Sequence, residues 1–369
     1  MEDKVSIIMP VHNGAKYLDA TVRRLLKQQY SDFEIILVEN NSNDNSWNLC
    51  QSLQEKDDRV RAFTVQTKGT TLARKYGVLQ AKGAYIVFHD QDDKLIDSMA
   101  VKNMVHAIKE DEAGICQFGY IKTIGGFINK KVPKSAKNHI QIFNREQIMN
   151  NQIRGVLGFG WSSDVVIGTQ VWNKIYKADL LKDAVRNINE SLYFCEDQYL
   201  NTFAFFNEKT NKVSVRDEYY YCWTVGIGFS SSKDALMTFI KDYQHIKRAS
   251  IPLIKEHSTS RVLSQAHWDT LTVYKWTIYN MLYKRIPKEQ IIQTIEEIEK
   301  YQYIQEAKEE LRCMEEAKKF KDVDFLTSDY SSLQYFDYCR STLPSRSTKT
   351  VLKAKVKDIL VNITKRIIR

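Results

Sequence analysis

The sequence predicts an α/β fold in which a mainly parallel sheet flanked by helices is followed by an all-helical C-terminal region. In residues 5–93, short apolar runs alternate with stretches of helical period, which is typical of βαβ units and a parallel sheet. All 14 glycines lie at or before Gly228, so the rest of the chain lacks the usual supplier of tight turns. We therefore expect long helices there, and we place a domain boundary near residue 230.

Each predicted strand is a short apolar run that polar or turn-forming residues end. Pro10 ends the first run, and Asn13-Gly14 is a turn signal before a helix whose apolar residues recur at helical spacing. The polar stretch 39–46 ends the second run, and the acidic stretch 89–93 follows the fourth. In order, the expected strands are residues 5–9, 34–38, 61–65 and 84–88, and the helices between them are residues 18–26, 47–53 and 72–80.

Beyond residue 93 the periods are less regular until the C-terminal region begins. Further strands are expected at residues 115–121 and 213–215. The expected C-terminal helices are residues 235–251, 262–282, 289–301 and 304–317. We divide the chain into a first domain of residues 1–230, a helical domain of residues 231–345 and a tail of residues 346–369.

The positive charge of the chain is concentrated in this tail. Lys and Arg number 54 against 45 Asp and Glu, and residues 346–369 hold eight of these basic residues with a single acid, Asp358. Since a basic stripe over a whole domain is what nucleic-acid binders carry, no nucleic-acid partner is expected. The tail pattern is amphipathic, and two interpretations stay open: an interfacial helix on anionic lipid, or a helix docked on its own domain.

The chain carries no targeting pattern. No apolar run reaches the ~18 residues that a membrane-spanning helix needs. The start opens directly on an apolar strand without a signal-peptide layout. We expect a cytoplasmic protein, which lies peripherally at the inner face of the plasma membrane if the tail binds lipid.

An acidic cluster, Asp90, Asp92 and Asp93, directly follows the fourth predicted strand. In open parallel sheets, ligands bind beyond the carboxyl ends of the strands, where the polar stretches after Met9, Val38 and Phe88 converge. Mg²⁺ or Mn²⁺ held by one or two carboxylates and by substrate phosphates would relieve the repulsion within the cluster. The alternative is a solvated acidic turn that caps the next helix.

A second acidic pair, Glu196-Asp197, lies among apolar neighbours more than 100 residues later. Burial among such neighbours raises a carboxyl pKa towards the range of a general base. The alternative is an exposed acidic pair at the start of a helix.

Seven motifs in order resemble those of family 2 glycosyltransferases, enzymes of the GT-A type fold that move a sugar from a nucleotide diphosphate sugar to an acceptor hydroxyl. The resemblance covers residues 4–232. The motifs are residues 5–18, residues 36–46, Ala73-Arg74 with Gly77, residues 81–93 with Asp90-Gln91-Asp92, Trp172-Asn173-Lys174-Ile175-Tyr176, Glu196-Asp197, and Tyr221-Cys222-Trp223 before Ser230-Ser231-Ser232.

The resemblance implies roles for individual residues. Asp197 matches the catalytic base, and Asp90 and Asp92 match the Asp-x-Asp motif, which binds Mn²⁺ or Mg²⁺. The residues expected to bind the donor are Pro10, Val11, Asn13, Glu39, Asn40, Arg74, Asp90, Gln91 and Lys174. One departure concerns the nucleotide: Glu39-Asn40-Asn41 stands where the family usually has two Asp and a Gly.

The function expected from this resemblance is a bacterial, metal-dependent, inverting glycosyltransferase in surface glycan or glycoprotein assembly. The donor is a nucleotide sugar, with UDP as the default, and the acceptor is a glycan, glycolipid or glycoprotein. The alternative is a non-catalytic carbohydrate or membrane-surface binding module on the same fold. A dehydrogenase is excluded, because the loop after the first strand lacks Gly-x-Gly-x-x-Gly.

Overall fold

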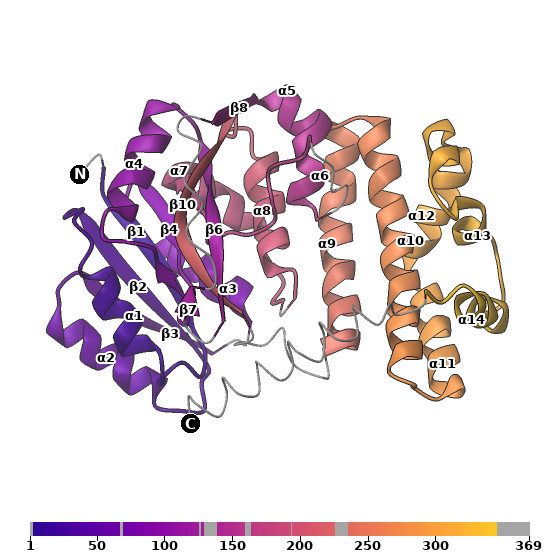
Figure 1. The fold of residues 1–369 in the computed structure, drawn as a ribbon, viewed down its shortest axis with the longest axis horizontal. Coiled ribbons are helices and arrows are strands. Elements are labelled where there is room, and N and C mark those ends of the chain that lie inside the picture. The colour runs from indigo at the N-terminus through magenta and orange to yellow at the C-terminus, as the bar shows by residue number, and fades with distance from the viewer. Residues whose placement is uncertain are drawn as a thin grey trace.

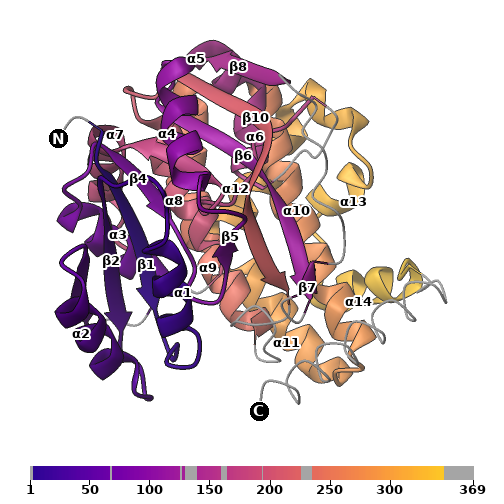
Figure 2. The ribbon, with the colours of Figure 1, turned by 60° about the vertical axis from the view of Figure 1, so that its left-hand side comes forward.

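A mixed sheet forms the centre of the N-terminal part of the protein. The computed structural model describes residues 3–66, 69–124, 127–128, 139–158, 164–192, 194–225 and 235–344. Within these residues the sheet has ten strands, and its main path runs in the order β3-β2-β1-β4-β9-β6-β10-β5. Figures 1 and 2 show helices on both sides of the sheet, with the C-terminal helices continuing outward from α8.

The four strands expected in residues 5–93 lie next to one another and run parallel. β1 (Val5–Val11) pairs with β2 (Phe33–Asn40) on one side and with β4 (Tyr85–Phe88) on the other. β2 pairs in turn with β3 (Val60–Val65). Because all four strands point the same way, the loops that follow β1, β2 and β4 meet at one edge of the sheet, as predicted.

β1 runs two residues further than expected because Pro10 does not interrupt it. The last hydrogen bond from β1 towards β4 is accepted by the carbonyl oxygen of Ile8 from His89 N, at 2.9 Å. Since alternate residues of a strand point to the same neighbour, the missing N–H of Pro10 falls beyond the end of β4. No ladder hydrogen bond is therefore lost there.

The other half of the sheet makes it mixed. β9 (Lys174–Lys177) lies antiparallel between β4 and β6 (Ile115–Ile124), and β10 (Lys212–Val225) runs parallel to β6. β5 (Lys94–Leu95) pairs antiparallel with β10. The two further strands are β7 (Phe127–Ile128), which pairs with β6, and β8 (Ile140–Asn144), which pairs with β10.

Helices cover both faces of the sheet. Alternate residues of β1 pack into different clusters: Ile8 joins residues of α3 (Thr70–Gln80), whereas Ile7 and Met9 join residues of α1 (Leu18–Leu25). The α1 cluster also contains residues of α2 (Ser46–Lys56) and α4 (Ala100–Glu110), and the α3 cluster those of α6 (Ile153–Val156), α7 (Ala178–Ala184) and α8 (Glu196–Phe206).

From Ala235 to Pro344 the regular structure is helical, so the predicted fold class is confirmed. α9 continues through Pro252 to His257, six residues beyond the expected end. The helices are α9 (Ala235–His257), α10 (Ser260–Tyr283), α11 (Lys288–Glu299), α12 (Gln302–Cys313), α13 (Val323–Thr327) and α14 (Ser332–Ser341). None of the helices in the described part of the chain is both long enough and apolar enough to span a membrane.

The core of the N-terminal part extends into the first C-terminal helix. Ile246 and Ile254 of α9 belong to the same buried cluster as Leu200 of α8 and Ile8 of β1. The boundary expected near residue 230 falls between Val225 and Ala235, and the tail of residues 346–369 follows Pro344; both lie outside the described residues.

Candidate active site

Gln91 ties the loop after β4 to the loop after β1. Its Oε1 accepts a hydrogen bond from the main-chain N–H of His12 at 3.1 Å, and its Nε2 donates to the His12 carbonyl oxygen at 2.9 Å. Gly14 leaves room for this contact, because a Cβ at Gly14 would lie 2.0 Å from Gln91 Oε1. The side-chain amide of Gln91, which was expected to contact the donor, thus has a structural role between these two loops.

The loops after β1 and β2 are joined by hydrogen bonds around Asn13. The Asn13 N–H donates to Ser42 Oγ at 3.0 Å, and Asn13 Oδ1 accepts from the N–H of Asn43 at 2.8 Å. Asn13 and Asn41 adopt left-handed φ angles of 49° and 52°, which asparagine tolerates better than most residues. The side chain of Asn13 thus holds the neighbouring loop.

Glu39 and Asn40, at the end of β2, are both buried. The Glu39 carboxylate accepts hydrogen bonds from the Ser42 N–H at 2.5 Å and from Thr64 Oγ1 at 2.8 Å. Asn40 Oδ1 has no hydrogen-bond partner among the described residues. These contacts order the loop in which the donor nucleotide was expected.

Pro10 and Val11 differ in how much of their surface is exposed to solvent. Pro10 is half-buried, whereas Val11 lies entirely within the core and exposes no surface. Of this expected pair, only Pro10 presents a surface to a ligand in this conformation.

The three carboxylates of the acidic cluster have different environments. Asp93 is buried; it accepts hydrogen bonds from Tyr221 Oη at 2.9 Å and from the Thr224 N–H at 2.7 Å, and so anchors β10. Burial, with Asp90 and Asp92 nearby, raises the pKa of Asp93 to about 8. Burial and the neighbouring Asp90 raise the pKa of Asp92 to about 6.

Asp90 and Asp92 fit the expected divalent metal. Carboxylate oxygens are the ligands that Mg²⁺ and Mn²⁺ prefer, and a cation beside Asp92 would offset the repulsion that raises its pKa. Among the described residues no group of three or more His, Cys, Asp and Glu side chains is arranged to hold a metal. A site of two carboxylates would need phosphate and water oxygens to complete it, which is the usual arrangement for Mg²⁺.

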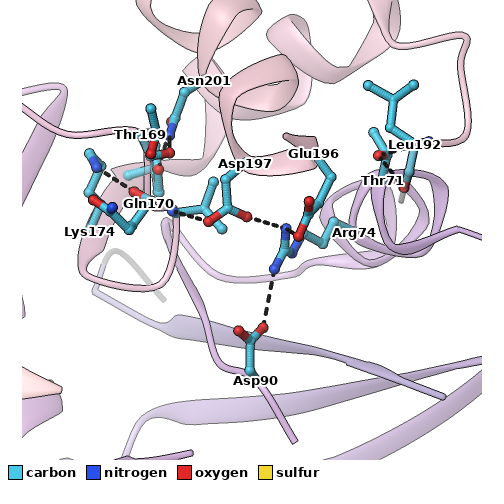
Figure 3. Close-up of polar contacts among 12 residues, drawn as sticks. Thr71, Arg74, Asp90, Thr169, Gln170, Lys174, Leu192, Glu196, Asp197 and Asn201 are labelled. Atoms are coloured by element: carbon cyan, nitrogen blue, oxygen red, sulfur yellow. Dashed lines mark hydrogen bonds and ion pairs between the residues drawn. The ribbon is translucent and has the colours of Figure 1, made fainter. Parts of the chain in front are cut away.

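The guanidinium of Arg74, from α3, lies between the two acidic clusters (Figure 3). Its Nη2 pairs with Asp90 at 3.1 Å, and its Nη1 pairs with Asp197 and, at 3.6 Å, with Glu196. Arg74 is 2% exposed. Burial alone would lower the pKa of Arg74, but the carboxylates of Asp197, Asp90 and Glu196 outweigh it and raise that pKa. Arg74 is therefore a permanent positive charge.

Asp197 lies in the first turn of α8, whose start is set by Cys195 in a left-handed conformation with φ of 55°. Asp197 Oδ1 accepts from Arg74, and Oδ2 accepts from the main-chain N–H of Val171 at 3.2 Å. Burial raises the pKa of Asp197, while Arg74 opposes the rise. The carboxylate is thus held from two sides in a single orientation.

Glu196 differs from Asp197 in its distance from the Arg74 guanidinium and in the environment that sets its pKa. Its carboxylate lies further from the guanidinium, and its side chain is 25% exposed. Burial and the adjacent Asp197 raise the pKa of Glu196 to about 8. Asp197 therefore has the shorter contact with the Arg74 guanidinium.

The loop before α8 is held by both neighbouring helices. From α3, Thr71 Oγ1 accepts from the Leu192 N–H at 3.3 Å, and Lys75 Nζ donates to the Ile188 carbonyl oxygen at 2.6 Å. From α9, the Asp242 carboxylate accepts from the N–H of Phe194 at 2.8 Å.

Lys174 does not lie where a donor contact was expected. It begins β9 and is fully buried, and its Nζ donates to the carbonyl oxygens of Gly168, at 2.9 Å, and Gln170 and to Asn173 Oδ1 at 3.3 Å. Burial lowers the pKa of Lys174 to about 7, against the opposite effect of Asp197. All three ammonium protons thus have acceptors within the protein, and none points to a ligand.

The sequence did not predict the contribution of β10 to the site. Tyr221 Oη, besides its bond to Asp93, accepts from the Asp90 N–H at 3.1 Å. The Tyr221-Cys222-Trp223 motif was the feature of the sequence that could have indicated this contribution. The motif does not reveal its partner, because Tyr221 and Asp93 lie more than 120 residues apart in the chain.

The fold is of the GT-A type, and the comparisons with known proteins show which family the N-terminal part resembles. The model described as Glycosyl transferase family 2 matches residues 6–169. The chain is therefore similar to this family over its N-terminal part.

Two relatives illustrate how far the similarity extends. The glycosyltransferase GlyG of Streptococcus pneumoniae is 34% identical over 131 residues, which cover 34% of this chain and 43% of GlyG. The cholesterol galactosyltransferase of Borreliella burgdorferi is 25% identical over 331 residues, which cover 86% of this chain and 87% of that protein. The chain thus spans less than half of the first relative and most of the second.

Solved structures support the fold. The crystal structure of S. aureus TarS 1–349 in complex with UDP-GlcNAc has a TM-score of 0.61 and 21% identity, and the match covers 92% of this chain and 87% of that one. The complex of the same TarS fragment with UDP has a TM-score of 0.63. At this identity the likeness establishes the arrangement of helices and strands.

Proposed function

We propose that the protein transfers a sugar from a UDP-sugar to an acceptor hydroxyl in bacterial glycan assembly, with inversion at the anomeric carbon. The observation that carries the proposal is the position of Arg74, which joins Asp90 of the acidic loop to Asp197 at the start of α8. This pairing supports Asp197 as the base, because ligands of parallel sheets bind beyond the strand ends, where Asp90 lies.

Asp197 is the general base in this proposal. Its Oδ1 is paired with Arg74, and its Oδ2 accepts from Val171, so the carboxylate is oriented before an acceptor arrives. It takes the proton of the acceptor hydroxyl as the oxygen attacks the anomeric carbon, while the bond to the nucleotide diphosphate breaks on the opposite face. A single displacement of this kind inverts the configuration.

The residues on the nucleotide side bind and orient the donor. Asp90 and Asp92 would hold Mn²⁺ or Mg²⁺, which when bound supplies positive charge opposite the departing diphosphate. Gln91 keeps the acidic loop against the loop after β1, and Asn40 contributes a buried amide oxygen that lacks a partner among the described residues. Among the described residues, Arg74 is the cation that pairs with both acidic clusters.

The choice of donor and acceptor is supported by the relatives. TarS has been crystallised with UDP and with UDP-GlcNAc. A further relative, the poly(ribitol-phosphate) β-glucosyltransferase of Bacillus spizizenii, is 30% identical over 224 residues, 59% of this chain. These support a UDP-sugar as the donor and a glycan as the acceptor.

The proposal is tested with a panel of UDP- and GDP-sugars in the absence of an acceptor, because many transferases hydrolyse their own donor slowly. Metal-dependent hydrolysis of one UDP-sugar, lost in Asp197→Asn, is the expected result. Hydrolysis of GDP-sugars alone would overturn the choice of nucleotide. Tight binding of a UDP-sugar without hydrolysis, and without transfer when acceptors are added, would favour the non-catalytic binding module instead.

A further inference from the structure

The loop of residues 168–173 directly precedes β9 and contacts Asp197, the candidate base. Its Val171 N–H donates to Asp197 Oδ2 at 3.2 Å, and it is one of the two described contacts that orient this carboxylate (Figure 3). The position of the loop therefore determines where the second carboxylate oxygen of Asp197 lies.

Lys174 holds the loop from its C-terminal side. Its buried ammonium donates to the carbonyl oxygens of Gly168 and Gln170, which flank Thr169, so the chain turns around the charge. The main-chain N–H of Lys174 donates in addition to the Val171 carbonyl oxygen at 3.3 Å. One residue thus fixes three carbonyl groups of the segment that presents the Val171 N–H.

Two side chains hold the same loop from other elements. Asn201, one turn after Asp197 on α8, donates from Nδ2 to the Thr169 carbonyl oxygen at 2.6 Å, and its Oδ1 accepts from Tyr176 Oη at 2.9 Å. Gln117 of β6 accepts from the Gly168 N–H at 2.9 Å. These contacts fix main-chain groups of Gly168 and Thr169 from β6 and α8, in addition to those that Lys174 holds.

We propose that Lys174 is a positioning residue for Asp197: it acts through the main chain of residues 168–171 and does not contact the donor. The inference rests on the proposed function, because it assigns Lys174 to the same base. Its ammonium protons point to Gly168, Gln170 and Asn173, which leaves no proton for a diphosphate. Its charge also lies close enough to Asp197 to stabilise the ionised carboxylate, which supports the assignment.

The distinguishing experiment compares Lys174→Met with Lys177→Met. Lys177 lies on the same strand but is exposed, so it controls for loss of a lysine from β9. Both variants are assayed by hydrolysis of the UDP-sugar that the wild-type protein turns over fastest, with donor affinity measured separately. We expect Lys174→Met to lower kcat about tenfold or more, since a hydrogen bond to a charged group is lost, while the donor Kd changes less than twofold.

The pH profile separates positioning from a general loss of structure. In Lys174→Met the Asp197 carboxylate loses both the aligned Val171 N–H and a nearby cation, so its pKa rises. The acid limb of kcat should then move upward by about one pH unit, whereas it stays in place in Lys177→Met. A fall in kcat that is equal at every pH would overturn the proposal, and so would a raised donor Kd with kcat preserved.

Asn201→Ala provides an independent route if Lys174→Met does not fold, because it removes the contact from α8 to the same loop. The same shift of the acid limb is expected, and an unshifted limb in a folded Asn201→Ala protein overturns the proposal. A failure of the proposed function looks different. In that case Asp197→Asn hydrolyses donor at the wild-type rate, or the wild-type protein hydrolyses none.

Discussion

Arg74 pairs with Asp197, a residue 123 positions further along the chain. The same guanidinium reaches Asp90 at 3.1 Å, so one buried cation holds both the loop that was expected to bind metal and the residue that was expected to act as base. The relative placement of the two acidic clusters therefore depends on a single side chain of α3.

Replacing Arg74 with Met should lower the free energy of unfolding by about 3–5 kcal/mol near pH 7, the usual cost of removing one partner from a buried ion pair. Asp90, Glu196 and Asp197 would then repel one another without a compensating cation, and the pKa values of Glu196 and Asp197, which burial already raises, would rise further. The loss should therefore shrink as the pH falls through these raised values, and it should be smallest below about 4, where the carboxyls become protonated in the unfolded chain as well. Urea denaturation at several pH values measures this.

Arg59→Met is the control for that measurement, because Arg59 pairs with Asp57 at a more exposed position. A surface pair of this kind contributes about 0–1 kcal/mol. A loss in Arg74→Met that is no larger than in Arg59→Met, or that is independent of pH, would contradict the role of Arg74.

Asp197→Asn should lower the rate of sugar transfer by about 10² to 10⁴, the usual contribution of a positioned base. Donor affinity should stay nearly unchanged, because the base acts on the acceptor. Glu196→Gln should cost less, since Glu196 lies further from Arg74 and has a pKa near 8. Transfer rates measured beside donor binding decide between the two residues, and an Asp197→Asn protein that fails only in donor binding would remove Asp197 from the role.

Asp92→Asn should abolish the metal-dependent part of UDP-sugar binding while leaving the fold intact. Burial and Asp90 raise the pKa of Asp92 to about 6, so protonation competes with the cation in the wild-type protein. The Mn²⁺-dependent affinity should accordingly fall as the pH drops through about 6. Calorimetry with and without a chelator measures both effects, with the exposed Asp58→Asn as the control. Full activity in excess chelator would exclude the metal.

Gly77→Ala should destabilise the protein by about 1–3 kcal/mol through overpacking. Its Cβ would lie 2.5 Å from Ile8 Cγ2 and 3.3 Å from Val38 Cγ2, so α3 must move away from the sheet, and Arg74 with it. Leu79→Ala, at an exposed position of the same helix, should change stability by less than about 0.5 kcal/mol. Denaturant titration of both variants tests this. Equal free energies of unfolding for the two variants would show that α3 can shift without destabilising the protein, which contradicts the prediction.

Deleting residues 346–369 should weaken binding to anionic vesicles, because the deleted segment carries eight basic residues and one acid. Binding of the intact chain should also weaken as salt rises, since surface electrostatics is screened over ~8 Å at physiological ionic strength. Vesicle co-sedimentation at two salt concentrations measures this. The docked helix would be supported if the intact chain did not bind vesicles and the truncated chain had a lower thermal stability.

The sequence predicted the elements whose signals are local. β1, β2, β3 and β4 are apolar runs with clear polar ends, and their parallel pairing brings the loops after β1, β2 and β4 to one edge of the sheet, as predicted. β9 escaped prediction because a four-residue strand, buried between two neighbours, has no alternation to reveal it. Its antiparallel direction depends on long-range pairing.

The direction of a side chain was the least predictable feature of the site. Lys174 belongs to a motif of the family, yet its Nζ turns back onto the loop that precedes it. Residue type and spacing do not distinguish a lysine that faces a phosphate from one that holds carbonyl groups. Arg74 was predicted near the nucleotide, but its position between two carboxylates follows from a contact between helices far apart in sequence.

The hydrogen bond from Phe194 to Asp242 has a consequence for how chains of this kind can exchange parts. Phe194 lies two residues before Glu196, and Asp242 belongs to α9, so the helical region supplies one of the supports of the candidate base. A chimera that joined residues 1–230 to the helices of another protein would keep every acidic side chain of the site and still lose that support. Recombination that preserves activity would therefore have to inherit α9 with the sheet and make its junction later in the chain.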